Sequence, residues 1–366
     1  MKDKYRAATS DGSTASPTPT IVEPTLKATN LKFLPGPITS NPKDELWSQQ
    51  WAPRAIKSQS AWAKGVTGKC VRVAVVDGGL WWDHPDLVGR VDVDYAKSFW
   101  PDLPPYFDSE SIRDSGYWHA SHVAGIVVAS ANNNDYGVVG IAPEATIVPV
   151  KVCDGGQCDF GAILQGIIYA ASAMEPGVGA GADVINLSLG AYGTPGGDNF
   201  FPWDFTQQLA AYSNFGSAAI WVAAPGGDTR AAEQFFDQYF DQEAGTFTPG
   251  APPLCYRNDF VLSVGAPNLA GKPAFAHLAG TSMATPAVSG AATLVIHDEA
   301  LRQGVDLCAP RGGKGMRRNP TTPGQVKAAL ARGAVLPNGG ADRQAYGSGI
   351  VDVPRTLGYP QPVWAA

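Results

Sequence analysis

The sequence predicts an α/β fold in which a mainly parallel central sheet carries helices on both faces. Three observations lead to this prediction: continuous apolar runs, helical segments that alternate with them, and 42 glycines and 30 prolines among 366 residues. Parallel strands that are buried on both faces have nearly continuous apolar sequence, and the helices between them cover the sheet. High glycine and proline content is typical of a fold whose short elements are joined by many loops.

The chain divides into two parts by composition. Residues 1–45 are rich in Thr, Ser, Pro and Lys without sustained periodicity, so we expect a disordered leader or the remnant of a prosegment. Residues 46–360 are expected to form one large domain, which starts with a short helical segment at residues 56–64.

Strands and helices alternate along this domain. Buried strands are expected in VRVAVVDGG, TIVPVKV, DVINLSLG, AIWVAA and FVLSVGA. Helices are expected in HASHVAGIVVAS, FGAILQGIIYAASAM, FTQQLAAYSNF, TSMATPAVSGAATLVI and TPGQVKAALARGA, the last of which has Pro early and Gly late. This order is the one expected of a parallel sheet covered on both sides.

Charge and hydropathy exclude several classes of partner. The net charge is -6 and charged residues make up 16% of the chain, without a basic stripe, so we expect no nucleic-acid partner. The longest apolar runs are far shorter than the roughly 20 residues that span a bilayer, so we expect no membrane segment. The N-terminus lacks the apolar core of a secretory signal.

Five cysteines leave their pairing open. Cys153 and Cys158 flank the turn-prone CDGGQC, where either a disulfide or two reduced thiols fit the sequence. Cys70, Cys255 and Cys308 are scattered, and an odd count leaves at least one thiol unpaired. A zinc site is disfavoured, since no second close pair of Cys or His accompanies CDGGQC.

Three segments carry residues suited to nucleophilic catalysis: VAVVDGGL with Asp77, HASHVAGI with His119, and GTSMATPAVSGAA with Ser282. Each residue alone has a structural alternative, as a turn former, a helix cap or an N-cap. Together, in the order Asp, His, Ser, they resemble the subtilisin family, whose motifs are D-[ST]-G, H-G-T-H-V-A-G and G-T-S-M-A-[ST]-P. The resemblance covers most of the chain from Leu46 to Leu357.

The resemblance implies a serine endopeptidase of the peptidase S8 family, monomeric and acting on polypeptides. His119 would act as general base for Ser282, Asp77 would orient the ring, and the Ser282 N–H at a helix N-terminus would face the oxyanion. Two alternatives stay open: a catalytically impaired pseudoenzyme that binds peptides, and an interaction protein in which the motifs are relics. The family resemblance favours secretion, whereas the chain shows no signal peptide, so the compartment stays open.

Two further sites follow from the same resemblance. Asp86 in WDHPDL and Asn134 in NNDYGV match family segments that bind calcium, so a structural calcium ion is expected as an alternative to a simple turn at Asp86. Ser188, Leu189 and Gly190 in NLSLG would line the substrate cleft, where their backbone pairs with an extended peptide.

The chain departs from the family pattern at three places. Gly78 and Ala120 replace residues of the first two motifs, and Ala120 is tolerable where its φ is negative. At the A-A-G-N corner, whose Asn completes the oxyanion hole in the family, we align Ala224 to Gly227, so that Gly227 replaces the Asn and the segment before GTSMATP is shortened. A rival alignment matches SNFGSAAIWVAAPG to the later F-S-N-Y-G…A-P-G segment of the family.

Overall fold

A computed structural model describes residues 20–22, 38–107, 118–131, 136–189, 220–227, 240–241, 246–247, 260–265, 273–310, 320–337 and 343–362. Its central sheet has the strand order β4-β6-β2-β9, and all neighbours are parallel. The strands are β4 (Lys97–Ser98), β6 (Thr146–Lys151), β2 (Arg72–Asp77) and β9 (Val184–Asn186). In the register of this sheet, Val73 lies opposite Ile147 on one side and Val184 on the other.

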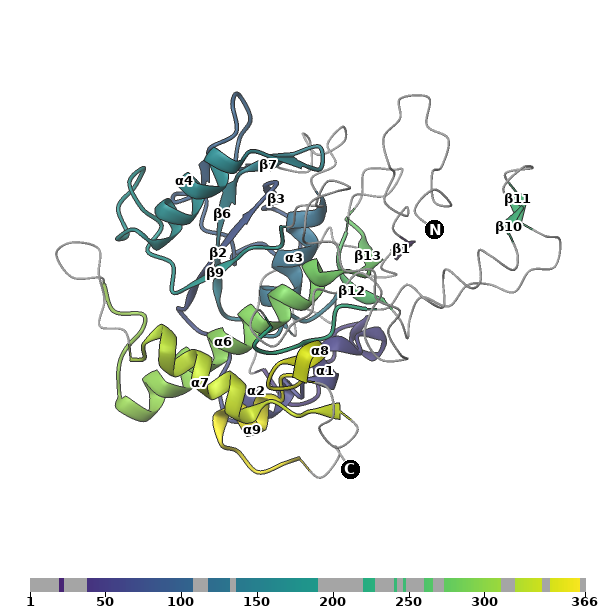
Figure 1. Cartoon of the computed structure of the whole chain (residues 1–366), viewed down its shortest axis with the longest axis vertical. Helices are drawn as coiled ribbons and strands as arrows, with labels where there is room; N and C mark the ends of the chain where they lie inside the picture. The colour runs from purple at the N-terminus through teal and green to yellow at the C-terminus, as the bar shows by residue number, and fades with distance from the viewer. Residues whose placement is uncertain are drawn as a thin grey trace.

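Both faces of the sheet are buried, as the apolar runs predict. Alternate residues of β2 enter different apolar clusters, Val73 and Val75 on one face and Ala74 and Val76 on the other. Helices α3 (Trp118–Val128) and α6 (Thr281–Gln303) cover the first face, and α4 (Phe160–Ala171) covers the second (Figure 1). The predicted α/β fold with helices on both faces of a parallel sheet is therefore confirmed.

A separate antiparallel sheet lies directly before α6. Strands β12 (Val261–Val264) and β13 (Phe275–Leu278) pair with each other, so the expectation that FVLSVGA continues the parallel sheet is wrong. The reason is the connection: only ten residues link the two strands, and a short connection joins antiparallel neighbours, whereas parallel strands need a longer crossover. Because β13 ends three residues before α6 begins, the hairpin leads straight to Ser282.

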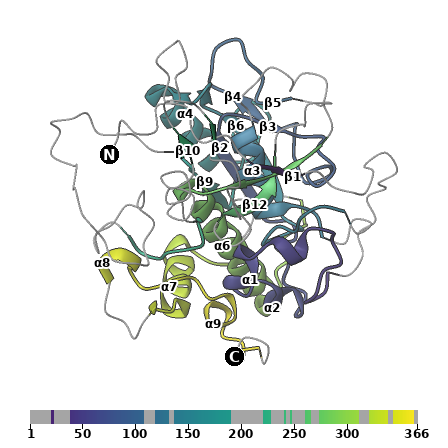
Figure 2. The same cartoon turned by 90° about the vertical axis from the view of Figure 1, so that its right-hand side faces the viewer.

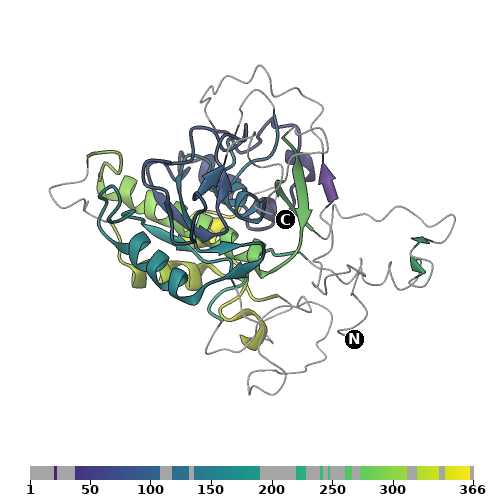
Figure 3. The ribbon, with the colours of Figure 1, turned by 90° about the horizontal axis from the view of Figure 1, so that it is seen from above.

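Residues 20–22, within the segment expected to be a disordered leader, add one strand to this hairpin. Strand β1 (Thr20–Val22) pairs antiparallel with β13, with Thr20 opposite His277, and Figure 3 shows the purple strand beside the green ones. In these three residues the structure differs from the disordered leader expected from composition, because main-chain hydrogen bonds to an open strand edge need no apolar pattern in the added strand.

The C-terminal helices pack with the first helices of the domain. Helices α1 (Ala52–Ala55) and α2 (Gln59–Trp62) replace the single segment expected at 56–64. Helix α2 packs on α9 (Val353–Leu357), and α9 packs on α7 (Pro323–Gly333) (Figure 2). Helix α7 starts with a capping box between Thr322 and Gln325, in agreement with the predicted helix there. The remaining short elements are η3 (Trp47–Gln49), β3 (Leu80–Trp81), β5 (Tyr106–Phe107), β7 (Cys153–Asp154), β8 (Gln157–Cys158), β10 (Phe240–Asp241), β11 (Thr246–Phe247) and α8 (Arg343–Tyr346).

Two disulfides connect distant and near parts of the chain. Cys153 and Cys158 form one, which is one of the two alternatives left open by the sequence. Cys70 and Cys308 form the other, 238 residues apart, which the sequence did not indicate. Cys255 and the helix expected in FTQQLAAYSNF lie outside the described residues. None of the helices described here has both the length and the apolarity needed to cross a membrane.

Candidate active site

Asp77 lies at the carboxyl end of β2, in the middle of the sheet. Its side chain is buried, and the Gly78 N–H donates a hydrogen bond to Oδ1 at 2.6 Å. The backbone thus supplies a donor at the position where Gly78 replaces the hydroxyl residue of the family motif. Carboxyl ends of parallel strands are where α/β folds place their sites, so this position suits a functional carboxylate.

Lys151, which the sequence analysis did not single out, supports the turn after Asp77. It lies opposite Asp77 in the register of β2 and β6, and its side chain is fully buried. Its Nζ donates to Gly78 O at 2.7 Å, Cys153 O at 2.8 Å and Asp154 Oδ1 at 3.0 Å. Burial lowers the pKa of Lys151, against the opposing effect of Asp154 and Asp77. A lysine at the end of the apolar run TIVPVKV was the available signal.

His119 is the second residue of α3, and it faces Asp77. Its Nδ1 lies 3.1 Å from Asp77 Oδ1 and 3.0 Å from Oδ2, and the imidazole is 35% exposed. Burial acts to lower the pKa of His119, but the charge and the hydrogen bond of Asp77 outweigh it and raise the pKa above its ordinary value. The ring is therefore held with one nitrogen on the carboxylate and its other edge accessible.

The start of α3 is held on two sides. Trp81, just after the Asp77 turn, donates its backbone N–H to Ser121 Oγ at 2.9 Å. His122 Nε2 lies 3.2 Å from Val261 O and 3.0 Å from Ala276 O, and burial lowers the pKa of His122 to about 3. A neutral His122 therefore donates from Nε2 to the β12–β13 hairpin that leads to Ser282.

Ser282 lies in the first turn of α6, behind the N-cap Gly280. Its Oγ donates to the backbone carbonyl of Ser188 at 3.3 Å, and within the described residues no hydrogen bond joins it to His119. Catalytic hydrogen bonds are often longer in enzymes without substrate. Thus the structure pairs Asp77 with His119 and Ser282 with Ser188. Leu189 follows Ser188, whereas Gly190 lies outside the described residues.

Asp86 is buried beside the loop at residues 136–140. Its Oδ2 accepts the Val138 N–H at 2.8 Å, and a Cβ added at Gly137 would lie 2.2 Å from the same oxygen. Asp44, also buried, lies two residues before Leu46, whose N–H donates to Gly137 O at 2.9 Å. Carboxylates and carbonyls beside one loop are ligands that suit Ca²⁺. Asn134 lies outside the described residues, and no group of three or more His, Cys, Asp or Glu able to hold a metal occurs among those that are described.

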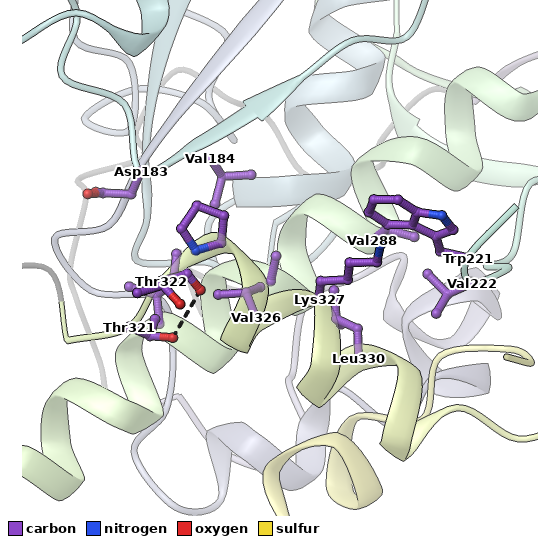
Figure 4. Close-up of a pocket in the computed structure, with 13 residues that line it drawn as sticks. Asp183, Val184, Trp221, Val222, Val288, Thr321, Thr322, Val326, Lys327 and Leu330 are labelled. Atoms are coloured by element: carbon purple, nitrogen blue, oxygen red, sulfur yellow. Dashed lines mark hydrogen bonds between the residues drawn. The ribbon is translucent and has the colours of Figure 1, made fainter. Parts of the chain in front are cut away.

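A cavity of about 290 Å³ lies away from these residues, between β9, α6 and α7 (Figure 4). Val184 borders it on one side, and Trp221 and Val222 border it on another. The Lys327 Nζ lies 2.7 Å from the centroid of the Trp221 ring, and both residues line the cavity. None of Asp77, His119 and Ser282 lines this cavity.

The site has a carboxylate at the end of a parallel strand, which is bonded to a histidine whose other edge is accessible. It also has a serine in the first turn of a helix. These features are those of the α/β serine hydrolases. Comparison with known proteins narrows the class. The model of the Subtilase family, Peptidase_S8, matches residues 68–268 and 203–349. The chain belongs to the subtilase family of serine endopeptidases.

Named relatives agree with this assignment. The chain is 34% identical over 257 residues to Thermitase from Thermoactinomyces vulgaris, covering 68% of this chain and 82% of the relative. It is 32% identical over 254 residues to Subtilisin E from Bacillus subtilis, covering 66% of this chain and 59% of the relative. It is 30% identical over 358 residues to the Extracellular basic protease of Dichelobacter nodosus, of which it spans 55%.

Solved structures share the fold. A protease from Pseudoalteromonas arctica has a TM-score of 0.60 at 24% identity, covering 87% of this chain and 98% of that chain. The serine protease of Aeromonas sobria has a TM-score of 0.57 at 19% identity, covering 88% of this chain and 69% of that chain.

Proposed function

We propose that this subtilase hydrolyses peptide bonds through an acyl-enzyme on Ser282, with His119 as general base and Asp77 orienting the imidazole. The observation that carries the proposal is the contact of His119 Nδ1 with both carboxylate oxygens of Asp77, at 3.1 and 3.0 Å. This contact keeps the proton on Nδ1 and leaves Nε2 to accept the proton of the serine hydroxyl.

The steps follow from this arrangement. Ser282 Oγ exchanges its hydrogen bond to Ser188 O for one to His119 Nε2, loses its proton to that nitrogen and attacks the scissile carbonyl. The Ser282 backbone N–H and the N-terminus of α6 stabilise the developing oxyanion. His119 then gives the proton to the leaving amine, and water hydrolyses the ester. The backbone of residues 188–190 binds the peptide as an added strand.

Labelling with a fluorophosphonate tests the proposal. We expect covalent labelling that Ser282→Ala abolishes, with casein hydrolysis in the unsubstituted protein and none in the variant. Labelling without hydrolysis would favour the peptide-binding pseudoenzyme, and unlabelled, inactive protein would favour an interaction protein. Ser58→Ala serves as the control, because the Ser58 hydroxyl donates to Pro53 O in the α1–α2 region.

We infer that residues 220–227 correspond to the later A-P-G segment of the family, and not to the A-A-G-N corner. Consecutive strands of a βαβ unit usually lie side by side, so the corner strand would pair with β9. Instead Ala223 bridges Ile350, and the cavity separates Trp221 from Val184 (Figure 4). The two matched family ranges overlap at 203–268, which fits a stretch that aligns in two ways. The shortened segment then lies between NLSLG and SNFG.

The exact A-A-G-N motif does not occur in the chain, and we propose that the family's side-chain donor to the oxyanion is missing. In subtilisin, removing this donor lowers kcat by about 10²–10³, a magnitude that we carry over. We therefore expect slow peptide hydrolysis beside an intact relative such as Subtilisin E under the same assay. Turnover equal to that of the relative would show that another donor, Asn199 or Asn214, serves the oxyanion.

A structural calcium ion is proposed at Asp86 and Asn134, as many subtilases bind calcium. Support comes from the buried Asp86 carboxylate beside loop 136–140 and from buried Asp44 next to the segment that bonds this loop. Added calcium should raise the thermal midpoint, and EDTA should lower it, because the ion binds only the folded chain. An unchanged midpoint would leave Asp86 as a turn residue that accepts the Val138 N–H.

One peptidase domain at residues 46–360 is the proposed organisation, with a monomer as the working unit. The family match at residues 68–349 supports most of this span. The two disulfides favour an oxidising compartment. Light scattering at several concentrations tests the monomer, and limited proteolysis of Ser282→Ala tests the boundary near residue 46.

A further inference from the structure

Two reciprocal hydrogen bonds join the first turn of α6 to the residues after β9. Ser188 Oγ donates to the backbone O of Ser282 at 3.0 Å, and Ser282 Oγ donates to the backbone O of Ser188 at 3.3 Å. Inside a helix, the carbonyl of residue 282 would accept the N–H of residue 286. That residue is Pro286, which has no N–H. The Ser188 hydroxyl therefore supplies the donor that the helix lacks at the nucleophile.

The Ser188 hydroxyl is itself oriented by two buried side chains. Asn186 Nδ2 donates to Ser188 Oγ at 2.9 Å, and Ser289 Oγ donates to Asn186 Oδ1 at 3.0 Å. Asn186 is fully buried, and Ser188 and Ser289 are each 6% exposed. Because a hydroxyl has a single proton, accepting a bond from Asn186 leaves that proton to point at Ser282 O. These hydrogen bonds form a chain from Ser289 on α6 through Asn186 on β9 and Ser188 back to Ser282 on α6.

We propose that Ser188, Asn186 and Ser289 are positioning residues, which fix the Ser282 main chain in the first turn of α6 through the Ser188 hydroxyl. The inference rests on the proposed role of Ser282 as nucleophile. Ser282 contributes both the attacking Oγ and the oxyanion N–H, so a shift of its main chain displaces both groups at once. The role of the hydroxyl is distinct from peptide pairing by the residue 188 backbone, which Ser188→Ala leaves intact.

Paired variants at Ser188 test the hydroxyl. We expect Ser188→Ala to lower kcat and the fluorophosphonate labelling rate about tenfold, the loss of one buried hydrogen bond to the nucleophile, with KM changed by less than about twofold. Ser188→Thr keeps a hydroxyl and should retain most of both rates. Ser289→Ala, one bond further from Ser188, should cause a smaller loss. Ser58→Ala removes another buried hydroxyl-to-carbonyl bond and should lower the Tm without lowering kcat.

A double-mutant cycle with Pro286→Ala isolates the mechanism. Alanine at 286 restores the helical N–H that donates to Ser282 O, so the hydroxyl becomes redundant there. Ser188→Ala should then lower kcat by less than about threefold in the Pro286→Ala background, against about tenfold alone. Equal losses in the two backgrounds would overturn the inference, as would a Ser188→Ala protein whose kcat is unchanged or whose loss lies in KM.

Failure of this inference is distinguishable from failure of the proposed function. If the unsubstituted protein is labelled at Ser282 and Ser188→Ala is labelled at the same rate, only the positioning role is lost. If the unsubstituted protein is not labelled at Ser282, the nucleophile assignment is overturned and the positioning role with it.

Discussion

One neighbour, Asp77, sets both the orientation and the pKa of the His119 imidazole. Asp77 approaches its Nδ1 with both oxygens, and this carboxylate raises the pKa of the imidazole although burial acts in the opposite direction. A general base must be neutral to accept a proton, so activity needs a pH above the pKa of His119. Asp77 thus holds the ring in a fixed orientation, and it also moves the acid side of the activity–pH profile to higher pH.

Replacement of Asp77 tests this balance. We expect kcat/KM to rise with pH through a midpoint above the ordinary imidazole value of 6.5. Asp77→Asn should move this midpoint down, because the charge that favours the imidazolium is gone, and should lower kcat roughly 10⁴-fold. Asp92→Asn, whose carboxylate pairs with Arg72, is the matched control. An unmoved midpoint in Asp77→Asn would contradict the assignment of the acid limb to His119.

The loop at residues 136–140 illustrates how an element depends on one backbone position. Gly137 has a φ of 75°, and its missing Cβ leaves room for the Asp86 carboxylate, which accepts the Val138 N–H. The Gly137 carbonyl accepts the Leu46 N–H, and the Val139 N–H donates to Gln50 Oε1. The loop therefore links the HPDL segment to residues 46–50.

Two glycine substitutions measure this dependence. Gly89 has a φ of 77° with open space where a Cβ would be, so Gly89→Ala should cost only the left-handed backbone strain, about 1 kcal/mol. Gly137→Ala should cost about 3 kcal/mol, because it adds a clash with Asp86 and loses a buried hydrogen bond. Urea unfolding, in the Ser282→Ala background to prevent autolysis, gives both values. Equal costs would show that the loop moves away from Asp86 freely.

At the scale of the whole molecule, the two disulfides act on very different lengths of chain. Cys70 precedes β2, and Cys308 follows α6, so their bond encloses the parallel sheet, the hairpin and all three proposed catalytic residues. The bond between Cys153 and Cys158 joins residues that are only five positions apart in sequence. Constraint of the unfolded chain grows with the length of the closed loop.

Removal of each disulfide should separate these effects. The loop-entropy relation gives about 5.5 kcal/mol for a separation of 238 residues and about 2 kcal/mol for one of five. We expect a Cys70→Ser, Cys308→Ser protein to lose more free energy of unfolding than a Cys153→Ser, Cys158→Ser protein. Urea titration under non-reducing conditions, in the Ser282→Ala background, measures both. A larger loss for the short bridge would contradict an origin in loop closure.

The sequence by itself determined the class of fold, the strands β2, β6 and β9, and the helices α3 and α4 that follow β2 and β6, because burial on both faces requires unbroken apolar runs. Three motifs also identified Asp77, His119 and Ser282 as the candidate residues, since local sequence fixes which residue ends a strand or begins a helix. The structure places His119 Nδ1 within hydrogen-bond reach of Asp77.

Only the tertiary structure decided which strands pair and which residues distant in sequence contact one another. Whether FVLSVGA joins the parallel sheet or forms a hairpin depends on its partner strand, which an apolar pattern does not specify. Three contacts join residues that lie far apart in sequence or on different elements. They are the Cys70–Cys308 disulfide, the hydrogen bond from Lys151 to the turn after Asp77, and the hydrogen bonds from Ser289 through Asn186 to Ser188. Such contacts follow from packing geometry, because a polar side chain becomes buried only where the fold brings it a partner.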